Sequence, residues 1–201
     1  KVSLSSSEDM LRQVDTLRDL PMMARMQVKP QALPMYDIAE IAYSSLSANF
    51  EESEIDIELD IEPKHLVFVD ESLIRRVVVN LLHNAYKFTP EKGKVLIRLL
   101  EDGKKENYVC IQIADTGPGI PEDQRDRIFG QYIQIEDNNH RPRAGGKGTG
   151  LGLNFCKLAV EAHGGQIWVE ADSPLSGGCF SFTLPITDWR PSSSSTDDNA
   201  E

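Results

Sequence analysis

Polar side chains recur along one face of a helix predicted over residues 72–88. At 100° per residue, Asn80, Asn84 and Lys87 fall within about 60° of one another. The apolar positions that can instead face a sheet are Leu73, Val77, Leu81 and Ala85. Two amide oxygens and an ammonium suit a magnesium ion bound to phosphate, because hard cations prefer oxygen ligands and lysine neutralises phosphate charge. A solvated helix face is the alternative that this helix alone leaves open.

A second stretch with chemical potential is IQIADTGPGI, residues 111–120. Its predicted strand ends at Asp115, and Gly117 and Gly119 follow around a proline. Such a pattern is often only a turn signal. It also fits an acceptor carboxylate at the mouth of a pocket, where a glycine floor lets a flat ring lie close.

A third stretch, GGKGTGLGL at residues 145–153, concentrates glycines in front of a helix. Gly148, Gly150 and Gly152 run into an apolar helix face marked by Leu151, Phe155, Leu158, Ala159 and Ala162. Free N–H groups at a helix N-terminus bind anions such as phosphate. The spacing matches neither G-x-x-x-x-G-K-[ST], since glycine follows Lys147, nor G-x-G-x-x-G.

Composition narrows the function classes. The 201 residues carry a net charge of −11, which argues against a general nucleic-acid binder. No stretch has the apolar length of a membrane span, and no signal-peptide pattern opens the chain. Cys110, Cys156 and Cys179 lack metal-ligand spacing and are predicted to be buried, which suits a reducing compartment. Because the chain starts with Lys1 rather than methionine, we expect a fragment of a longer protein.

The order of elements predicts an α+β fold, with one mixed sheet covered on one face by helices. Residues 29–34 are predicted to be a linker, and residues 36–50 a helix with Asp37 as its N-cap and Ile38, Ile41, Ala42 and Leu46 on its apolar stripe. Alternation and β-branched runs predict strands over 54–62, 65–69, 94–101, 107–115, 166–170 and 179–185. The helix after the glycine loop is expected to extend to about His163.

Taken together, four stretches resemble the N, G1, F and G2 boxes of sensor histidine kinases. They are NLLHNAYKFTP, DTGPGIP, RIFGQYIQ and GGKGTGLGL…EAHGG, and the resemblance covers roughly residues 30–187. These kinases belong to the GHKL superfamily, shared with a heat-shock chaperone, the gyrase B subunit and MutL. The glycine stretch and the helix after it are similar to cyanobacterial members. The resemblance implies the Bergerat ATP-binding fold, a two-layer α/β sandwich.

The resemblance also implies a role for each matching position. Asn80, Asn84 and Lys87 would be catalytic, with Asn84 as the Mg²⁺ ligand and Lys87 on the phosphates of ATP. Asp115 would accept a hydrogen bond from the adenine amino group. The remaining nucleotide-binding positions would be Gly117, Gly119, Ile120, Tyr132, Lys147, Gly148, Thr149, Gly150, Leu151 and Gly152. Tyr132 and Gly130 depart from the phenylalanine and the acidic residue common in the family.

Residues 133–147 show no periodic pattern, as expected for a lid that orders on nucleotide binding. Arg141, Arg143 and Lys147 are its cations. One of them could reach the γ-phosphate, and for each a solvated charge is the alternative. The glycine loop that follows would offer backbone donors to the phosphates.

No histidine lies in the His-Glu or His-Asp context of a phosphoacceptor. His65, His83, His140 and His163 are interpreted as structural or solvent-exposed, with a nucleotide-side role open for His83. Residues 1–27 resemble the end of a dimerisation helix whose acceptor histidine is absent. Residues 28–187 would form the ATP-binding domain, and the polar residues 188–201 a disordered tail.

The predicted function is therefore that of a sensor histidine kinase catalytic domain. It would bind Mg-ATP and phosphorylate a histidine on the separate dimerisation domain of a homodimer, which then serves a response regulator receiver domain. We expect a cytoplasmic location without nucleic-acid or direct membrane contact, even if the full-length protein is membrane-anchored. The fragment alone is expected not to autophosphorylate. Alternatives are an ATPase of the chaperone or topoisomerase type, which usually has a glutamate where Asn80 stands, and a degenerate module without nucleotide.

Overall fold

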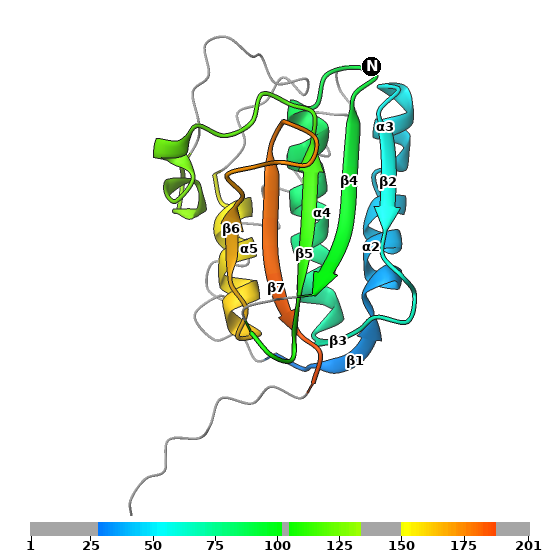
Figure 1. The fold of residues 1–201 in the computed structure, drawn as a ribbon, viewed down its shortest axis with the longest axis vertical. Coiled ribbons are helices and arrows are strands. Elements are labelled where there is room, and N and C mark those ends of the chain that lie inside the picture. The colour runs from blue at the N-terminus through cyan, green and yellow to red at the C-terminus, as the bar shows by residue number, and fades with distance from the viewer. Residues whose placement is uncertain (1–27, 102–104, 134–149, 188–201) are drawn as a thin grey trace, which may run out of the picture.

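The computed structural model describes residues 28–101, 105–133 and 150–187, which form a sheet layer and a helix layer (Figure 1). The main sheet has the strand order β2-β4-β5-β7-β6. Its strands are β2 (Asp56–Asp60), β4 (Lys94–Glu101), β5 (Tyr108–Asp115), β7 (Cys179–Pro185) and β6 (Ile167–Val169). β2 runs parallel to β4, and the other neighbours are antiparallel. The predicted mixed sheet is confirmed.

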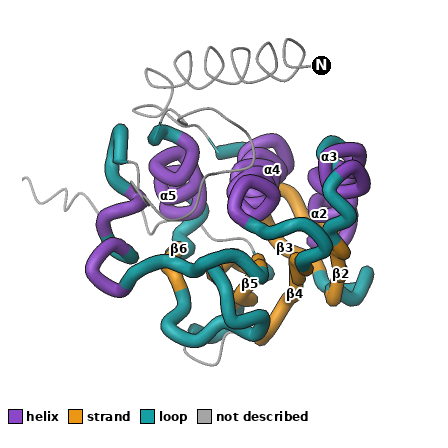
Figure 2. The backbone as a smooth tube through the Cα atoms, turned by 90° about the horizontal axis from the view of Figure 1, so that it is seen from above, coloured by secondary structure: helices purple, strands orange, loops and turns teal. Residues whose placement is uncertain are grey.

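The helices cover one face of this sheet, as the view from above shows (Figure 2). They are α2 (Met35–Ser44), α3 (Ser47–Glu52), α4 (Glu71–Phe88) and α5 (Gly152–Ala162). Short helical turns η1 (Glu122–Gln124) and η2 (Arg127–Phe129) follow β5. Apolar side chains from both layers form one core, in which Val77, Leu81 and Phe155 of the helices meet Ile111 and Phe182 of the sheet. The predicted α+β two-layer architecture is thus confirmed.

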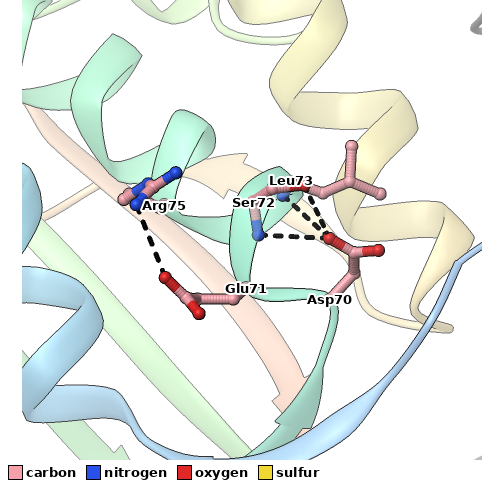
Figure 3. Close-up of polar contacts among 5 residues, drawn as sticks. All are labelled: Asp70, Glu71, Ser72, Leu73 and Arg75. Carbon is pink, nitrogen blue, oxygen red and sulfur yellow. Dashed lines mark hydrogen bonds and ion pairs between the residues drawn. The ribbon is translucent and has the colours of Figure 1, made fainter.

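Helix α4 begins at a side-chain cap (Figure 3). The Asp70 carboxylate accepts hydrogen bonds from the backbone N–H groups of Ser72 at 3.1 Å and Leu73 at 3.3 Å. One turn further, Arg75 lies 3.4 Å from Glu71 in an i,i+4 pair. An acceptor at the N-cap satisfies donors that the helix cannot pair itself, so the start of α4 is fixed locally.

Helices α4 and α5 run antiparallel, because the end of α5 meets the beginning of α4. His163, which follows α5 and is 2% exposed, accepts a hydrogen bond from the Asp70 backbone N–H through Nε2 at 2.9 Å. Its Nδ1 lies 2.7 Å from the Ala159 carbonyl oxygen and donates to it. This pair of partners requires a neutral imidazole. Burial lowers the pKa of His163, which is consistent with that state.

Three local predictions in the N-terminal part are wrong. Residues 29–34 are not a linker, because β1 (Gln31–Pro34) pairs antiparallel with β3 (Leu66–Val69) in a separate two-stranded sheet. Asp37 is not the N-cap of α2, since Pro34 occupies that position and Asp37 lies in the first turn. The expected single helix is broken into α2 and α3.

The buried side chains of this segment differ from the predicted apolar stripe at two positions. Ile38, Ala42 and Leu46 are buried as predicted, but Ile41 is 46% exposed and Ala39 is buried instead. The predictions for residues 1–27 and 188–201 lie outside the described residues.

Candidate functional site

The Asp115 carboxylate lies at the end of β5 and is held by backbone donors. Its Oδ1 accepts hydrogen bonds from the N–H groups of Gly117 at 2.7 Å and Gly178 at 3.2 Å. The side chain is 6% exposed, and burial raises the pKa of Asp115 although the two N–H donors act in the opposite direction. Because both donors use Oδ1, Oδ2 receives neither of them. The site thus contains an oriented carboxylate acceptor.

Glycines make this close approach possible. A Cβ at Gly117 would lie 2.7 Å from Asp115 Oδ1 and 2.9 Å from the carbonyl oxygen of Phe88, at the end of α4. At Gly178 it would lie 2.7 Å from Asp115 Oδ2, and at Gly177 only 2.2 Å from the Asp115 carbonyl oxygen. The loop after β5 and the turn before β7 therefore enclose the carboxylate at the end of α4.

The polar stripe of α4 faces the beginning of α5 at Asn80. A Cβ at Gly152 would lie 3.7 Å from both Cγ and Oδ1 of Asn80. Asn80, Asn84 and Lys87 are all half-buried, which distinguishes this stripe from a fully solvated face. Lys87 Nζ lies 5.2 Å from the centroid of the Phe88 ring. The stripe thus begins opposite the first turn of α5 and continues along α4 to its end, where Asp115 is enclosed.

The N-terminus of α5 differs from that of α4 because no side chain caps it. Its N-cap residue, Leu151, is fully buried and its side chain gives no capping hydrogen bond. The first intrahelical donor is Phe155, which bonds to the Leu151 carbonyl at 2.9 Å. The N–H groups of the preceding turn, which includes Gly152, are those that a helix N-terminus offers to an anion.

Tyr132 and Gly150 bring the F-box segment next to the start of α5. The Tyr132 N–H donates to the Gly150 carbonyl oxygen at 3.0 Å, and both residues have positive φ, 59° and 70°. A Cβ at Gly150 would lie 2.6 Å from the Tyr132 carbonyl carbon, so this position requires glycine. The Tyr132 side chain is 61% exposed.

The other predicted nucleotide-binding residues fall into two groups. Gly119 has a φ of 76°, and the half-buried Ile120 packs against the main core. Lys147, Gly148 and Thr149 lie outside the described residues, as do the cations Arg141 and Arg143. Their predicted roles stay predictions.

A cavity of about 480 Å³ lies beside this arrangement, lined by Gly119, Ile120, Arg125 and the turn from Glu170 to Gly178. None of the α4 stripe residues or Asp115 lines it. Its lining mixes a guanidinium with two carboxylates, whereas the stripe and the α5 N-terminus present amides, an ammonium and N–H donors. The second set is the one that suits a phosphate.

The cysteines agree with their predicted burial, and His163 agrees with its predicted structural role. All three cysteines are buried and form no disulfide, and burial raises the pKa of Cys156 to about 12. His163 is a buried structural residue. His140 lies outside the described residues. Among the described residues, no group of three or more His, Cys, Asp or Glu side chains could hold a metal ion.

Comparison with known proteins identifies the family to which the elements of this site belong. Residues 69–188 match the family described as histidine kinase-, DNA gyrase B- and HSP90-like ATPase. The chain belongs to this family. The match spans α4, the Asp115 loop and α5, which are the elements that form the candidate site.

Individual relatives narrow the resemblance to sensor kinases. The chain is 40% identical over 166 residues to the adaptive-response sensory kinase SasA of Gloeothece citriformis, covering 81% of this chain and 40% of that protein. It superposes on the catalytic domain of histidine kinase ThkA with a TM-score of 0.67 and 26% identity, covering 80% of this chain and 99% of that domain. Full-length ShkA in complex with AMPPNP superposes with a TM-score of 0.71 and 27% identity, covering 90% of this chain and 36% of that chain. ThkA is also known in complex with the response regulator protein TrrA.

These similarities confirm the sequence-based resemblance, including its cyanobacterial character. The domain is of the type found as the ATP-binding catalytic domain of sensor histidine kinases. The chain spans about two fifths of the length of the SasA proteins that it matches. None of the helices in the described ranges has the length and apolarity needed to cross a membrane.

Sequence reasoning missed four residues that shape the site or fix the helices that carry it. Gly177 and Gly178 were not singled out, although consecutive glycines after Ser176 can signal a close backbone approach. Asn154 was not singled out, because a polar residue near a helix start has no distinctive periodicity. Asp70 was missed although an aspartate directly before a helix is a common N-cap signal.

Proposed function

We propose that this domain binds Mg-ATP and delivers the γ-phosphate to a histidine on a separate dimerisation domain. The observation that carries the proposal is the closeness of Gly152 to Asn80. Gly152 lies in the uncapped first turn of α5, and a Cβ added to it would be 3.7 Å from the Asn80 amide. This places backbone donors opposite the polar stripe of α4. Phosphoryl transfer needs mainly positioning and charge neutralisation from the protein, and these groups can supply both.

The base would bind at the opposite end of the site. The Asp115 carboxylate has its Oδ1 held by two N–H groups, so Oδ2 can accept from an exocyclic amino group. Adenine presents a donor at that position and guanine presents an acceptor. The complex of ShkA with AMPPNP, an adenine nucleotide, supports the assignment.

The residues present fit a magnesium ion held mostly by the nucleotide. No carboxylate or imidazole cluster occurs in the described part of the chain, and the polar stripe offers amide oxygens instead. Mg²⁺ usually takes one or two protein ligands and completes its shell with water and substrate phosphates. Asn84 would hold the ion with Asn80 beside it, and the ion would neutralise phosphate charge.

The partners follow from the same proposal. The acceptor histidine would lie in a dimerisation domain of the full-length homodimer, and residues 1–27 would be the end of its second helix. Residues 28–187 would act as the catalytic unit and residues 188–201 as its tail. A response regulator receiver domain would take the phosphoryl group, as the ThkA–TrrA complex suggests for a relative. The cytoplasm is the proposed location because ATP is available there.

Calorimetry with ADP, with and without Mg²⁺, tests nucleotide binding. Binding that depends on the ion is expected, and folded protein that gives no heat with either mixture would contradict the proposal.

Incubation with labelled ATP tests transfer. We expect acid-labile label only on an added dimerisation hairpin with its histidine, and none on the fragment itself.

Phosphate release in the labelled-ATP experiment separates the kinase from the ATPase alternative. The chain has Asn80 where chaperone-type relatives usually have a water-activating glutamate, so steady hydrolysis should be negligible without an acceptor. Sustained phosphate release by the fragment alone would favour the ATPase.

A further inference from the structure

The side chain of Asn154 joins the first turn of α5 to the F-box segment. Its Nδ2 donates a hydrogen bond to the Phe129 carbonyl oxygen at 3.0 Å, and the residue is 9% exposed. The two residues are 25 positions apart in the sequence. The contact therefore fixes α5 against a separate segment of the chain.

Phe129 is itself anchored to the sheet. Its ring packs edge-on against Phe180 of β7, with centroids 6.3 Å apart and planes at 85°. Ile128 and Phe129 are 3% and 5% exposed. The Phe129 carbonyl is thus a fixed acceptor. A donor on α5 that bonds to it is held in place relative to the sheet.

A second hydrogen bond lies close by, from the Tyr132 N–H to the Gly150 carbonyl at 3.0 Å. We call these two bonds the clamp, because they join residues 129–132 to residues 150–154. Gly152 lies between the two attachment points on the α5 side, and it is the residue that faces Asn80. The clamp therefore determines where the N–H groups of the first turn lie relative to the α4 stripe.

The choice of asparagine is not explained by fold stability. Asn154 Oδ1 is buried and has no hydrogen-bond partner among the described residues. An unsatisfied buried acceptor is a net cost to folding, which an apolar side chain of similar size would avoid. A residue retained at such a cost is a candidate for a functional constraint.

We propose that Asn154 is a positioning residue for phosphate binding. Through the clamp it holds the donor groups of the α5 first turn at the distance from Asn80 that the nucleotide phosphates require. The inference rests on the proposed function, since it assumes that phosphates bind between α5 and the α4 stripe. It assigns no contact between Asn154 and the nucleotide.

The test compares ligands with and without phosphates. Asn154→Leu keeps the side-chain volume but removes the donor. We expect ADP affinity by calorimetry to fall about fivefold or more, since one hydrogen bond no longer fixes α5. Adenosine affinity by NMR titration should stay within about twofold, because Asp115 and its glycines are untouched. The melting temperature without ligand should change little, because removal of the unsatisfied Oδ1 offsets the loss of the donor to the Phe129 carbonyl.

Two further variants complete the design. Lys157→Gln, on the exposed face of α5, is the matched control and should leave both affinities unchanged. Asn154→Ser, which shortens the side chain and breaks the bond to Phe129, replaces the leucine variant if that variant does not fold. It should show the same selective loss.

Three results are decisive. Unchanged ADP affinity in Asn154→Leu, with wild type binding ADP normally, would overturn the inference and leave the proposed function intact. Parallel loss of ADP and adenosine affinity with a lower melting temperature would show a general structural role and also overturn it. Failure of wild type to bind ADP would instead refute the proposed function.

Discussion

Replacing Asp115 with asparagine changes one oxygen of an enclosed carboxylate into an amino group and leaves the side-chain size unchanged. The amide oxygen can take the place of Oδ1 and accept from Gly117 and Gly178. The amino group then occupies the position of Oδ2, which we propose receives the adenine amino group. An acceptor that faces a donor becomes a donor that faces a donor.

The expected loss of affinity follows from the charge of the lost acceptor. A hydrogen bond to a charged group contributes about 1.5–3 kcal/mol. With 1.4 kcal/mol per tenfold change, ADP should bind about ten- to a hundredfold more weakly. GDP should be discriminated less, because an amide N–H can donate to the guanine O6.

The free energy of unfolding should not decrease in the same variant. Burial raises the pKa of Asp115 in the folded state, so its favourable contribution exists below the unfolded pKa, near 3.8, and is lost as the pH rises through the folded pKa. Above its folded pKa the wild type has lost that contribution and keeps a buried charge. The neutral asparagine removes this charge, and urea unfolding at pH 7 should show equal or higher stability.

The assay pairs calorimetric titration of ADP and GDP with urea unfolding, and Asp123→Asn in the exposed turn η1 serves as the matched control. The control should behave as wild type in both measurements. If Asp115→Asn binds ADP as tightly as wild type, the base-recognition role is wrong. If it loses binding only because it unfolds, the electrostatic argument is wrong.

Further predictions concern the metal, a histidine, a helix cap and a packed glycine. Asn84→Ala should reduce ADP affinity in Mg²⁺ to the value measured in EDTA; a wild-type magnesium dependence would refute its role as ligand. Because the folded pKa of His163 is lowered, the unfolded state takes up the proton first, and the free energy of unfolding should fall as the pH drops below 6.5. This pH-dependent loss should vanish in His163→Gln, as measured by urea titrations at pH 7.5 and 5. Asp70→Ala should cost about 1 kcal/mol of unfolding free energy through loss of the α4 cap, whereas no change would show that water replaces it. Gly165→Ala places a Cβ 2.0 Å from the Thr183 carbonyl oxygen and should destabilise by about 1–3 kcal/mol or more in the same assay; wild-type stability would contradict that packing.

Most of the main sheet and α4 could be predicted because their signals are local. Alternation over residues 54–62 gives β2, and the apolar positions of residues 72–88 give α4 within one residue of its start. Asp115 could be placed at a strand end because a glycine-rich turn follows a continuous apolar run. Each of these features is visible in a short window.

The errors arose where tertiary contacts outweigh local composition. Residues 29–34 contain two prolines and resemble a linker, but an edge strand tolerates proline, and Leu33 pairs with Val67 far along the chain. Asp37 has the composition of an N-cap, but the Met35 N–H bonds to the His65 carbonyl at 3.0 Å and the helix starts earlier. The approach of Gly152 to Asn80 depends on the antiparallel packing of two helices, which no sequence window reports.

The position of β5 has a consequence for how the site withstands thermal fluctuation. β5 is the third of five strands, and each of its eight residues is buried. Central strands open only in the highest-energy fluctuations and exchange their amide hydrogens last. Since Asp115 is the last residue of β5, the proposed base site is anchored to the slowest-exchanging part of the domain. The proposed phosphate site depends on the first turn of α5, and helix ends fray most easily. If both sites are as proposed, partial opening should release the phosphates before the base.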